Sequence, residues 1–443
     1  VSVSPSHKLL LGMAHLMQTK SIAGHRSCLN PARSRQCKCP YSQIVRAKSQ
    51  VIAQATHGDG ASEQPARMWG AGALAALQVF AGALTFAPDA SAVLNSPNAQ
   101  IARSVDAALR RSIPAFNPEV KELQTNLEEV AFLLRIPQRK PYGTMASNVE
   151  RALGVLDTQR ARLLDGVPLQ QRPDAEAVLD KLYGALKQLQ LAIKTQQPDF
   201  CGVRVADALK AISQLELLQA PGLAYSVPKD YAGLPRLVGR AVVSLRVEKA
   251  DGSAVFVDAK KGGVSRSADV EITLDGYSAP ITAGNFLVNV LDGKYNNRKL
   301  VGNYTAVIAP TPLTQTTTRP PIPLEILPLG EFDPVYRLPL DVQSGELPVL
   351  PLSLSGAVAM GHLEGESSYV SGDEWFVYKF DKQQAGLAGL AFDEGTFGVF
   401  GYVTKGMDAI SLLRSGDLIV SATVVSGAEK LVQPQPAPPP ASS

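Results

Sequence analysis

The sequence predicts a multidomain chain of α and β parts, in which a four-helix up-and-down bundle is followed by an antiparallel β-barrel capped by two helices. Three observations predict this fold class. The chain has 443 residues, which is too long for one ordinary core. Apolar residues repeat with the helical period over 96–220 and with the alternating period of a strand over 236–427. A linker rich in Pro and Gly, 221–235, separates the two patterns.

The first 92 residues precede both patterns and are predicted to be a two-part targeting segment that is removed. Residues 1–60 contain one acidic residue, Asp59, and eight basic residues, which is typical of an organelle transit peptide. Arg67 then precedes an apolar stretch, 68–87, and Ala90-Ser91-Ala92 is a small-residue cleavage signal. We therefore expect signal cleavage after Ala92.

Two targeting signals in series imply that two membranes are crossed, which favours the thylakoid lumen of a chloroplast. Arg67 has no twin-arginine partner, so we expect a Sec-type route. The alternative is that 68–87 is a transmembrane anchor, because the stretch approaches spanning length. Its Gly and Ala content and the signal after it favour cleavage. We expect the mature protein to contact the membrane only peripherally.

Charge and cysteine content exclude several kinds of ligand. The net charge of +3 is uneven, because residues 1–92 carry nine basic and three acidic residues and the remainder is mildly acidic. No basic stripe indicates nucleic-acid binding. Cys28, Cys37 and Cys39 lie in the targeting segment, where the spacing fits no zinc site, so we expect no metal and no cofactor. Only Cys201 remains in the mature chain, which excludes an internal disulfide.

The four helices are predicted from leucine and valine spacings of three and four residues and from end signals. The first helix starts at Asn117-Pro118-Glu119 and ends at Pro137, and the second has a cap at Thr144 and ends at Gly166. The third starts at Pro173-Asp174, and the fourth ends before Pro221-Gly222. The leucine stripes are interpreted as a shared core. The alternative, a dimer zipper, is disfavoured because the helices can pack on each other.

The β part is predicted from alternating strands, the first of which carries Val243, Leu245 and Val247 before a turn at Asp251-Gly252. Two helices interrupt the strands, near 282–292 with a cap at Thr282, and near 406–414. The tail, 433–443, is rich in proline and is predicted to be disordered and partly polyproline II.

The β part contains a series of short motifs in a fixed order. They are Ala279-Pro280-Ile281-Thr282, Asn285-Phe286, Tyr295, Gly356-Ala357-Val358-Ala359-Met360, Ser371-Gly372, Trp375-Phe376, Phe400-Gly401-Tyr402-Val403 and Gly406-Met407-Asp408. In this order they resemble the cyclophilin family of peptidyl-prolyl cis-trans isomerases. Ser226–Tyr231 and Pro323–Ile326 resemble the large thylakoid-lumen members of plants and algae, which join a bundle similar to the photosystem II protein PsbQ to a divergent cyclophilin domain. The resemblance implies a cyclophilin-like domain over 236–427, with a Pro-rich insertion at 309–352.

The resemblance implies isomerisation of X-Pro bonds, whose barrier is about 18–20 kcal/mol. In the family an arginine donates to the twisted prolyl nitrogen, and a phenylalanine and two glutamines accompany it. Those positions fall at Gly302 for the arginine, near Ala306 for the phenylalanine, and at Ala309 and Glu374 for the glutamines. Arg298, four residues early, is a possible substitute. Loss of one such donor costs about 2.7–4 kcal/mol. The catalytic residues are therefore unknown, and we expect weak or lost activity.

The apolar side of the family's peptide groove is predicted to persist and to hold a proline ring. Its residues are Ala359, Met360, Trp375, Phe376, Phe392 and Phe397. The insertion 309–352 is interpreted as an ordered excursion packed on the barrel; the alternative is a recognition segment or a lid on the groove. His362 is expected to face solvent rather than to act as a base.

The resemblance implies a lumenal chaperone or assembly factor for photosystem II, and the replaced positions imply weak or lost isomerase activity. One alternative is an active isomerase of lumenal protein folding, with a groove rebuilt from other residues. Another is a structural subunit that docks on the photosystem through its bundle. The expected partners, by resemblance, are photosystem II subunits or other thylakoid proteins.

Overall fold

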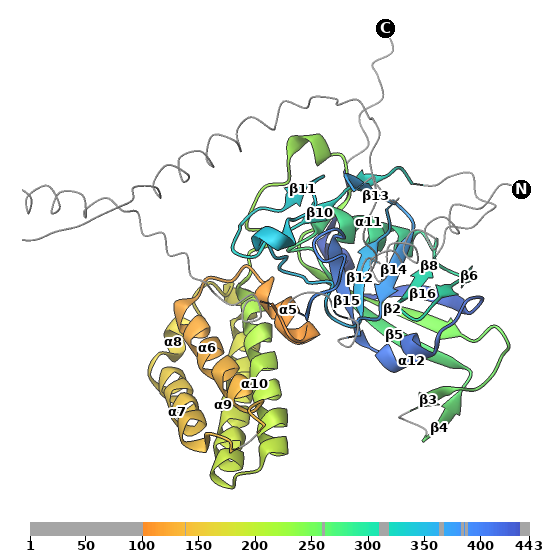
Figure 1. Ribbon diagram of the computed structural model, residues 1–443. Helices are drawn as coiled ribbons and strands as arrows, with labels where there is room; N and C mark the ends of the chain where they lie inside the picture. The colour runs from red at the N-terminus through yellow and green to blue at the C-terminus, as the bar shows by residue number, and fades with distance from the viewer. Residues whose placement is uncertain are drawn as a thin grey trace, which may run out of the picture. The chain divides into compact units, whose positions relative to one another are not determined.

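A helical part and a sheet part follow each other along the chain in the computed structural model (Figure 1). The structure describes residues 101–434, apart from 138, 259–261, 310–318, 363–366, 382–384 and 386–388. The predicted targeting segment and residues 435–443 of the predicted tail lie outside this range. Within it, no helix is long and apolar enough to cross a membrane, and no group of acidic, His or Cys side chains is arranged to hold a metal ion.

The helical part surrounds one apolar core. Its helices are α5 Val105–Arg111, α6 Pro118–Leu133, α7 Tyr142–Thr158, α8 Arg160–Leu163, α9 Arg172–Lys194 and α10 Pro198–Gln219, with a 3-10 turn at Leu169–Gln171. Helix α6 contacts α7 and α10, and α9 contacts the same two helices. The predicted leucine stripes meet in the core between them. The helical domain is thus confirmed, with two short helices, α5 and α8, that the spacing pattern did not predict.

The helix starts depend on side-chain acceptors. The Asn117 side chain accepts from the backbone N–H groups of Glu119 and Val120, both at 3.1 Å, as predicted. The predicted cap at Thr144 is wrong, because α7 already begins at Tyr142, after Pro141, and has no side-chain cap. The fixed φ of proline prepares the chain for a helix start without a polar cap.

The sheet part is a nearly closed antiparallel barrel. Its nine-stranded sheet has the order β6-β16-β2-β5-β15-β12-β14-β8-β7, and β6 and β7 are separated in the chain only by Leu300. The strands are β1 Arg236–Leu237, β2 Arg240–Glu248, β3 Phe256–Asp258, β4 Gly263–Ser265, β5 Ser267–Asp275, β6 Arg298–Lys299, β7 Val301–Gly302, β8 Ala306–Ala309, β9 Ile322–Pro323, β10 Glu325–Ile326, β11 Val335–Tyr336, β12 Ala357–Met360, β13 Tyr369–Val370, β14 Trp375–Tyr378, β15 Val399–Lys405, β16 Leu418–Ser426 and β17 Leu431–Val432.

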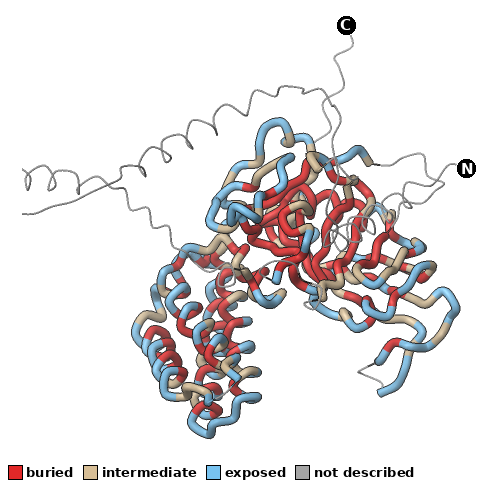
Figure 2. The backbone as a smooth tube through the Cα atoms, viewed as in Figure 1, coloured by how far each residue is buried: buried red, intermediate tan, exposed pale blue. Residues whose placement is uncertain are grey.

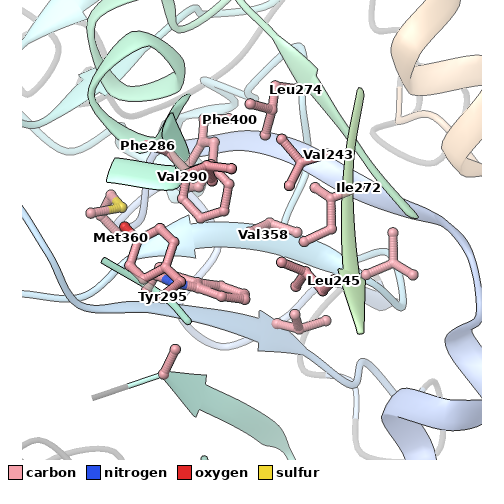
Figure 3. Packing of buried hydrophobic residues seen from close by; sticks show 14 of the residues in the cluster. Val243, Leu245, Ile272, Leu274, Phe286, Val290, Tyr295, Val358, Met360 and Phe400 are labelled. Atoms are coloured by element: carbon pink, nitrogen blue, oxygen red, sulfur yellow. The ribbon is translucent and has the colours of Figure 1, made fainter. Parts of the chain in front are cut away.

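Two α-helices accompany the barrel, α11 Pro280–Leu291 and α12 Met407–Leu412, close to the predicted positions. Short 3-10 helices lie at Lys229–Tyr231, Val342–Ser344 and Ala428–Lys430. Phe286 of α11 lies at the centre of the barrel core, with its ring centroid 5.2 Å from those of Tyr295 and Trp375 and 5.1 Å from that of Phe400. Figure 3 shows Phe286, Tyr295 and Phe400 among aliphatic side chains from the strands, and Figure 2 shows that buried backbone concentrates in this region.

The described part of the Pro-rich insertion, 319–352, is ordered and packs on the barrel. Ile322, Leu324, Ile326 and Leu340 belong to the barrel's core cluster. The interpretation as an ordered excursion is therefore confirmed for these residues. Strand β9 pairs with β13, and β10 pairs with β11.

A buried carboxylate in the insertion, Glu325, replaces the predicted cap of α11. Its Oε2 accepts from the backbone N–H of Ile281 and of Thr282, both at 3.0 Å, and from the Thr282 hydroxyl at 3.1 Å. Thr282 therefore lies inside the first turn and donates, and its predicted role as a cap is wrong. Glu325 stands where the helix N-terminus favours negative charge.

Short α5 is hydrogen-bonded to both parts of the chain. Asp275 of β5 is buried and accepts from the Ser112 hydroxyl at 2.9 Å and from Arg240 Nε at 2.8 Å. Arg240 also donates to the Leu109 carbonyl, and Arg110 forms an ion pair with Glu128 of α6 at 2.9 Å. The end of α5 thus supplies polar contacts to the barrel and to the helical core.

The predicted linker also contacts the barrel. The Tyr225 hydroxyl donates to the Tyr277 carbonyl at 3.0 Å, and the ring centroids of Tyr231 and Tyr336 lie 5.1 Å apart. Val227 and Leu234 pack against the barrel core. The independent folding of the two domains remains a prediction.

Stability should fall as pH rises from 5.5 to 7.5. Burial raises the pKa of Glu325 and of Glu216 in α10 from 4.5 to about 7. Between pH 4.5 and 7 the folded chain binds more protons than the unfolded chain. The contribution of these two groups to folding stability is therefore fully present below pH 4.5 and is lost as pH rises through 7. Urea unfolding at the two pH values should show that Glu325→Gln or Glu216→Gln each removes roughly 1–3 kcal/mol of the difference. An unchanged pH dependence in both variants would contradict this assignment.

Candidate functional site

The outer face of β12 and β14 carries an aromatic cluster. Ala359 and Phe376 are cross-strand partners, and their chain neighbours Val358, Met360, Trp375 and Val377 belong to the interior core. Because successive side chains of a strand point to opposite faces, Ala359 and Phe376 lie on the outside of the barrel. Phe376 is nevertheless only 1% exposed.

Phe376 is covered by an aromatic side chain from a distant loop. The ring of Phe397 meets it edge-on, with centroids 5.1 Å apart and an interplanar angle of 82°. The His362 ring stacks on Phe397 at 4.3 Å. The expectation that His362 faces solvent is corrected, since one face of its ring lies against Phe397. This edge-on and stacked arrangement is the favoured geometry of aromatic pairs.

Hydrogen bonds to the end of the insertion fix the loop that carries Phe397. Buried Glu394 accepts from the backbone N–H groups of Leu352 and Ser353, both at 2.8 Å, and from the Ser353 hydroxyl. The Ser353 hydroxyl oxygen accepts from the Ala391 N–H at 2.7 Å, and the Leu340 N–H donates to the Gly395 carbonyl at 2.9 Å. Burial raises the pKa of Glu394, and these donors oppose the rise.

Two of the predicted groove residues, Met360 and Trp375, lie inside the barrel. Both belong to the interior core cluster, so they support the sheet from behind and do not line an outer groove. The strand period explains the correction, because in each predicted pair of neighbours only one residue faces outward. Phe392 is 55% exposed in the loop that also carries Phe397. Of the six predicted residues, Ala359, Phe376 and Phe397 are the ones that the cluster brings together.

Comparison with known proteins agrees with this geometry. Residues 89–218 match the family model described as peptidyl-prolyl cis-trans isomerase CYP38-like, PsbQ-like domain. Residues 263–428 match the model of cyclophilin type peptidyl-prolyl cis-trans isomerase/CLD. The chain belongs to the cyclophilin family.

Named cyclophilin relatives cover most of the chain. The chloroplastic peptidyl-prolyl cis-trans isomerase CYP37 of Arabidopsis thaliana is 45% identical over 78% of this chain and 74% of its own length. A putative thylakoid lumen peptidyl-prolyl cis-trans isomerase of Synechocystis is 32% identical over 74% of this chain and 83% of its own length. Chloroplastic CYP38 of Arabidopsis thaliana is 26% identical over 78% of both. The predicted location in the thylakoid lumen of the chloroplast is thereby confirmed.

The position of the cyclophilin arginine, read as Gly302, has no space for a side chain. A Cβ at Gly302 would lie 2.8 Å from the Arg414 Cα and 2.9 Å from the Leu413 carbonyl oxygen. Ser415 reinforces this approach, since its hydroxyl donates to the Gly302 carbonyl at 3.1 Å. Contacts below 3.0 Å to backbone atoms force a shift of the main chain. The glycine is therefore required by the packing of β7 on the segment after α12.

The other mapped positions also supply no cation to the outer face. Ala309 belongs to the interior core, and Ala306 is buried at the start of β8. Glu374 precedes β14, where its carbonyl accepts from Gly361 N–H at 3.0 Å. Arg298 lies in β6 beside β16, and its Nε donates to the Lys294 carbonyl at 2.6 Å. It stands four residues before Gly302, roughly 13 Å along an extended chain.

The contact residues Glu394 and Ser353 were not predicted from the sequence. An acidic residue in a loop is most often solvated, so the sequence contains no signal that Glu394 is buried. His362 was recognised as a candidate, but its neighbour Phe397 is 35 positions away in the sequence. Only the fold brings these residues together.

Restoring the family arginine should disrupt the barrel and restore no activity. We expect Gly302→Arg to lower stability by roughly 1–3 kcal/mol, because its Cβ meets the backbone of Arg414. The matched control is Gly263→Arg, since a Cβ at Gly263 meets no atom within 4 Å. Thermal unfolding and an X-Pro peptide assay give the two readouts. A Gly302→Arg protein of wild-type stability with high isomerase activity would overturn the residue mapping.

Removing the Phe397 ring should open the outer face above Phe376. We expect Phe397→Ala to bind a proline-containing tetrapeptide about tenfold more tightly than the wild type, equivalent to ~1.4 kcal/mol. Phe392→Ala, in the same loop and already 55% exposed, should leave binding unchanged. Fluorescence anisotropy of a labelled peptide measures both. A folded Phe397→Ala variant that binds no better than the control would show that Phe397 does not close the face.

Proposed function

We propose that this cyclophilin is a chaperone or assembly factor for photosystem II in the thylakoid lumen, with weak or lost isomerase activity. The observation that carries the loss of activity is the packing at Gly302. A hydrogen-bond donor to the twisted amide is the main transition-state interaction in this chemistry. Gly302 has no side chain, and the backbone of Arg414 excludes one.

The closed outer face supports the same proposal. A prolyl ring must rest on an exposed apolar floor, and Phe376 is covered by Phe397. The loop with Phe397 is in turn hydrogen-bonded to the insertion through Glu394. An enzyme that turns over short peptides needs an open groove. The arrangement therefore favours recognition of folded partners over turnover of peptides.

A role in photosystem II assembly is supported by similarity to the PsbQ-like family model over residues 89–218. PsbQ itself is a photosystem II subunit, which makes the photosystem the first partner to test. A second candidate function is isomerase activity in lumenal protein folding. The names of the chloroplast and thylakoid lumen relatives, all peptidyl-prolyl isomerases, favour it.

The mature chain from Val93 should turn over an X-Pro tetrapeptide about 10²–10³-fold more slowly than a cyclophilin that retains its arginine. A protease-coupled assay measures the rate. The same chain, affinity-tagged and recovered from thylakoids, should retain photosystem II subunits, whereas an unrelated tagged lumen protein should not. A rate equal to that of the active cyclophilin would establish the isomerase alternative. Absence of photosystem subunits from the recovered material would reject the assembly role.

A further inference from the structure

One face of the helix pair α9 and α10 combines exposed apolar residues with a groove lined by basic residues. The two helices run side by side (Figure 1), joined by the short turn 195–197. A groove of about 330 Å³ lies between them. Its lining includes Lys181, Arg204 and Lys210, against one acidic residue, Asp207. Arg204 forms an ion pair with Asp207 at 3.1 Å, so the net positive charge of the groove comes from Lys181 and Lys210.

Three large apolar side chains extend this groove at the turn end of the helices. Leu191 is 62% exposed, Phe200 is 59% exposed and Val203 is 56% exposed. The helical period places all three on the groove face. Leu191 follows Gln188 by three residues, and Phe200 and Val203 each precede a lining residue of α10 by four. Both Gln188 and Arg204 line the groove. The apolar end and the basic end thus form one continuous surface.

The length of this surface defines the shape of a ligand. Phe200 and Lys210 are ten residues apart in α10, which corresponds to about 15 Å along the helix axis. A helix of about three turns spans the same distance. An amphipathic helix in a groove is a common mode of recognition, with apolar anchors at spacings of three and four residues.

We propose that this face of α9 and α10 binds an acidic, amphipathic helical segment of a partner protein. The segment places an apolar side chain against Leu191 and Phe200, and carboxylates near Lys181 and Lys210. The inference rests on the proposed function, because it identifies the chemistry of the partner that such an assembly factor recognises. Charge complementarity favours this ligand, since Lys181 and Lys210 repel a basic segment.

A designed peptide tests the charge requirement directly. The probe is a labelled 14-residue helical peptide with Leu and Phe at one end and Glu at the other; the comparison peptide has Lys at each Glu position. The mature chain should bind the acidic peptide at least tenfold more tightly than the basic one by fluorescence anisotropy. The preference should shrink between 0.1 and 0.5 M salt, because exposed charges are screened. Equal binding of the two peptides would overturn the proposal.

Surface variants test the location. Lys181→Glu with Lys210→Glu should abolish the preference for the acidic peptide, and Phe200→Ser should weaken binding at least fivefold. The matched controls are Arg139→Glu with Arg151→Glu, and Phe132→Ser in α6, where the side chain is 53% exposed. These controls should bind as the wild type does. Equal losses in the control and groove variants would overturn the proposal, as would a wild-type dimer that Phe200→Ser converts to a monomer.

Recovery of the tagged wild type and variant from thylakoids tests the assembly role and the proposed surface separately. If photosystem II subunits are retained by the wild type and lost by Lys181→Glu with Lys210→Glu, the function and the surface are both supported. If the subunits are retained equally by both proteins, the assembly role stands and the proposed surface is wrong. If no subunit is retained but the acidic peptide binds at the groove, the surface stands and the photosystem is not its partner.

Discussion

Two buried carboxylates accept from backbone N–H groups at the first turn of α11 and at the end of the Pro-rich insertion. Proline donates no hydrogen bond, and over the described residues 319–352 the insertion forms only strands of two residues, β9 to β11. Glu325 and Glu394 accept where the chain turns: one at the start of α11, the other at Leu352 and Ser353. Each carboxylate is desolvated, which is tolerated only because several donors converge on it. These two residues add hydrogen bonds to the apolar packing that holds the insertion on the barrel.

The hydrogen bonds of Glu394 also affect whether the outer face of β12 and β14 is open. Because Glu394 fixes the loop next to the insertion, Phe397 is held against Phe376, and the outer face of β12 and β14 is closed. The barrel fold is retained, with Phe286 in its core, although glycine, alanine and glutamate stand at the positions mapped to the family's arginine, phenylalanine and glutamines. A fold does not by itself determine activity, since one fold can carry different functions.

The period of the apolar residues was sufficient to predict the helical domain, the barrel and its two helices. It was not sufficient to assign faces, and Met360 and Trp375 were placed in the groove although they point inward. The predicted helix caps at Thr144 and Thr282 are wrong. Pro141 precedes the first helix, and the Glu325 carboxylate accepts at the start of the second. Short helix α5 has a local cap at Ser104, but its seven residues are too few to show a helical period. The contact between Glu394 and Ser353 was not predictable, because the two residues are far apart in the sequence. Local patterns report local structure, whereas the site is built from long-range contacts.

The closed groove and the exposed face of α9 and α10 have a joint consequence for recognition. On the barrel, the outer face of β12 and β14 is covered at Phe376 by the ring of Phe397. A partner that meets the helical domain finds apolar side chains and lysines on one surface. Burying Phe200 and Leu191 against a partner recovers apolar area that the folded chain leaves in water, at about 25 cal/mol per Å². This exposed apolar area is one source of binding free energy in the helical domain. The end of short α5 contacts both Asp275 of the barrel and Glu128 of the helical core, so polar contacts join the two parts.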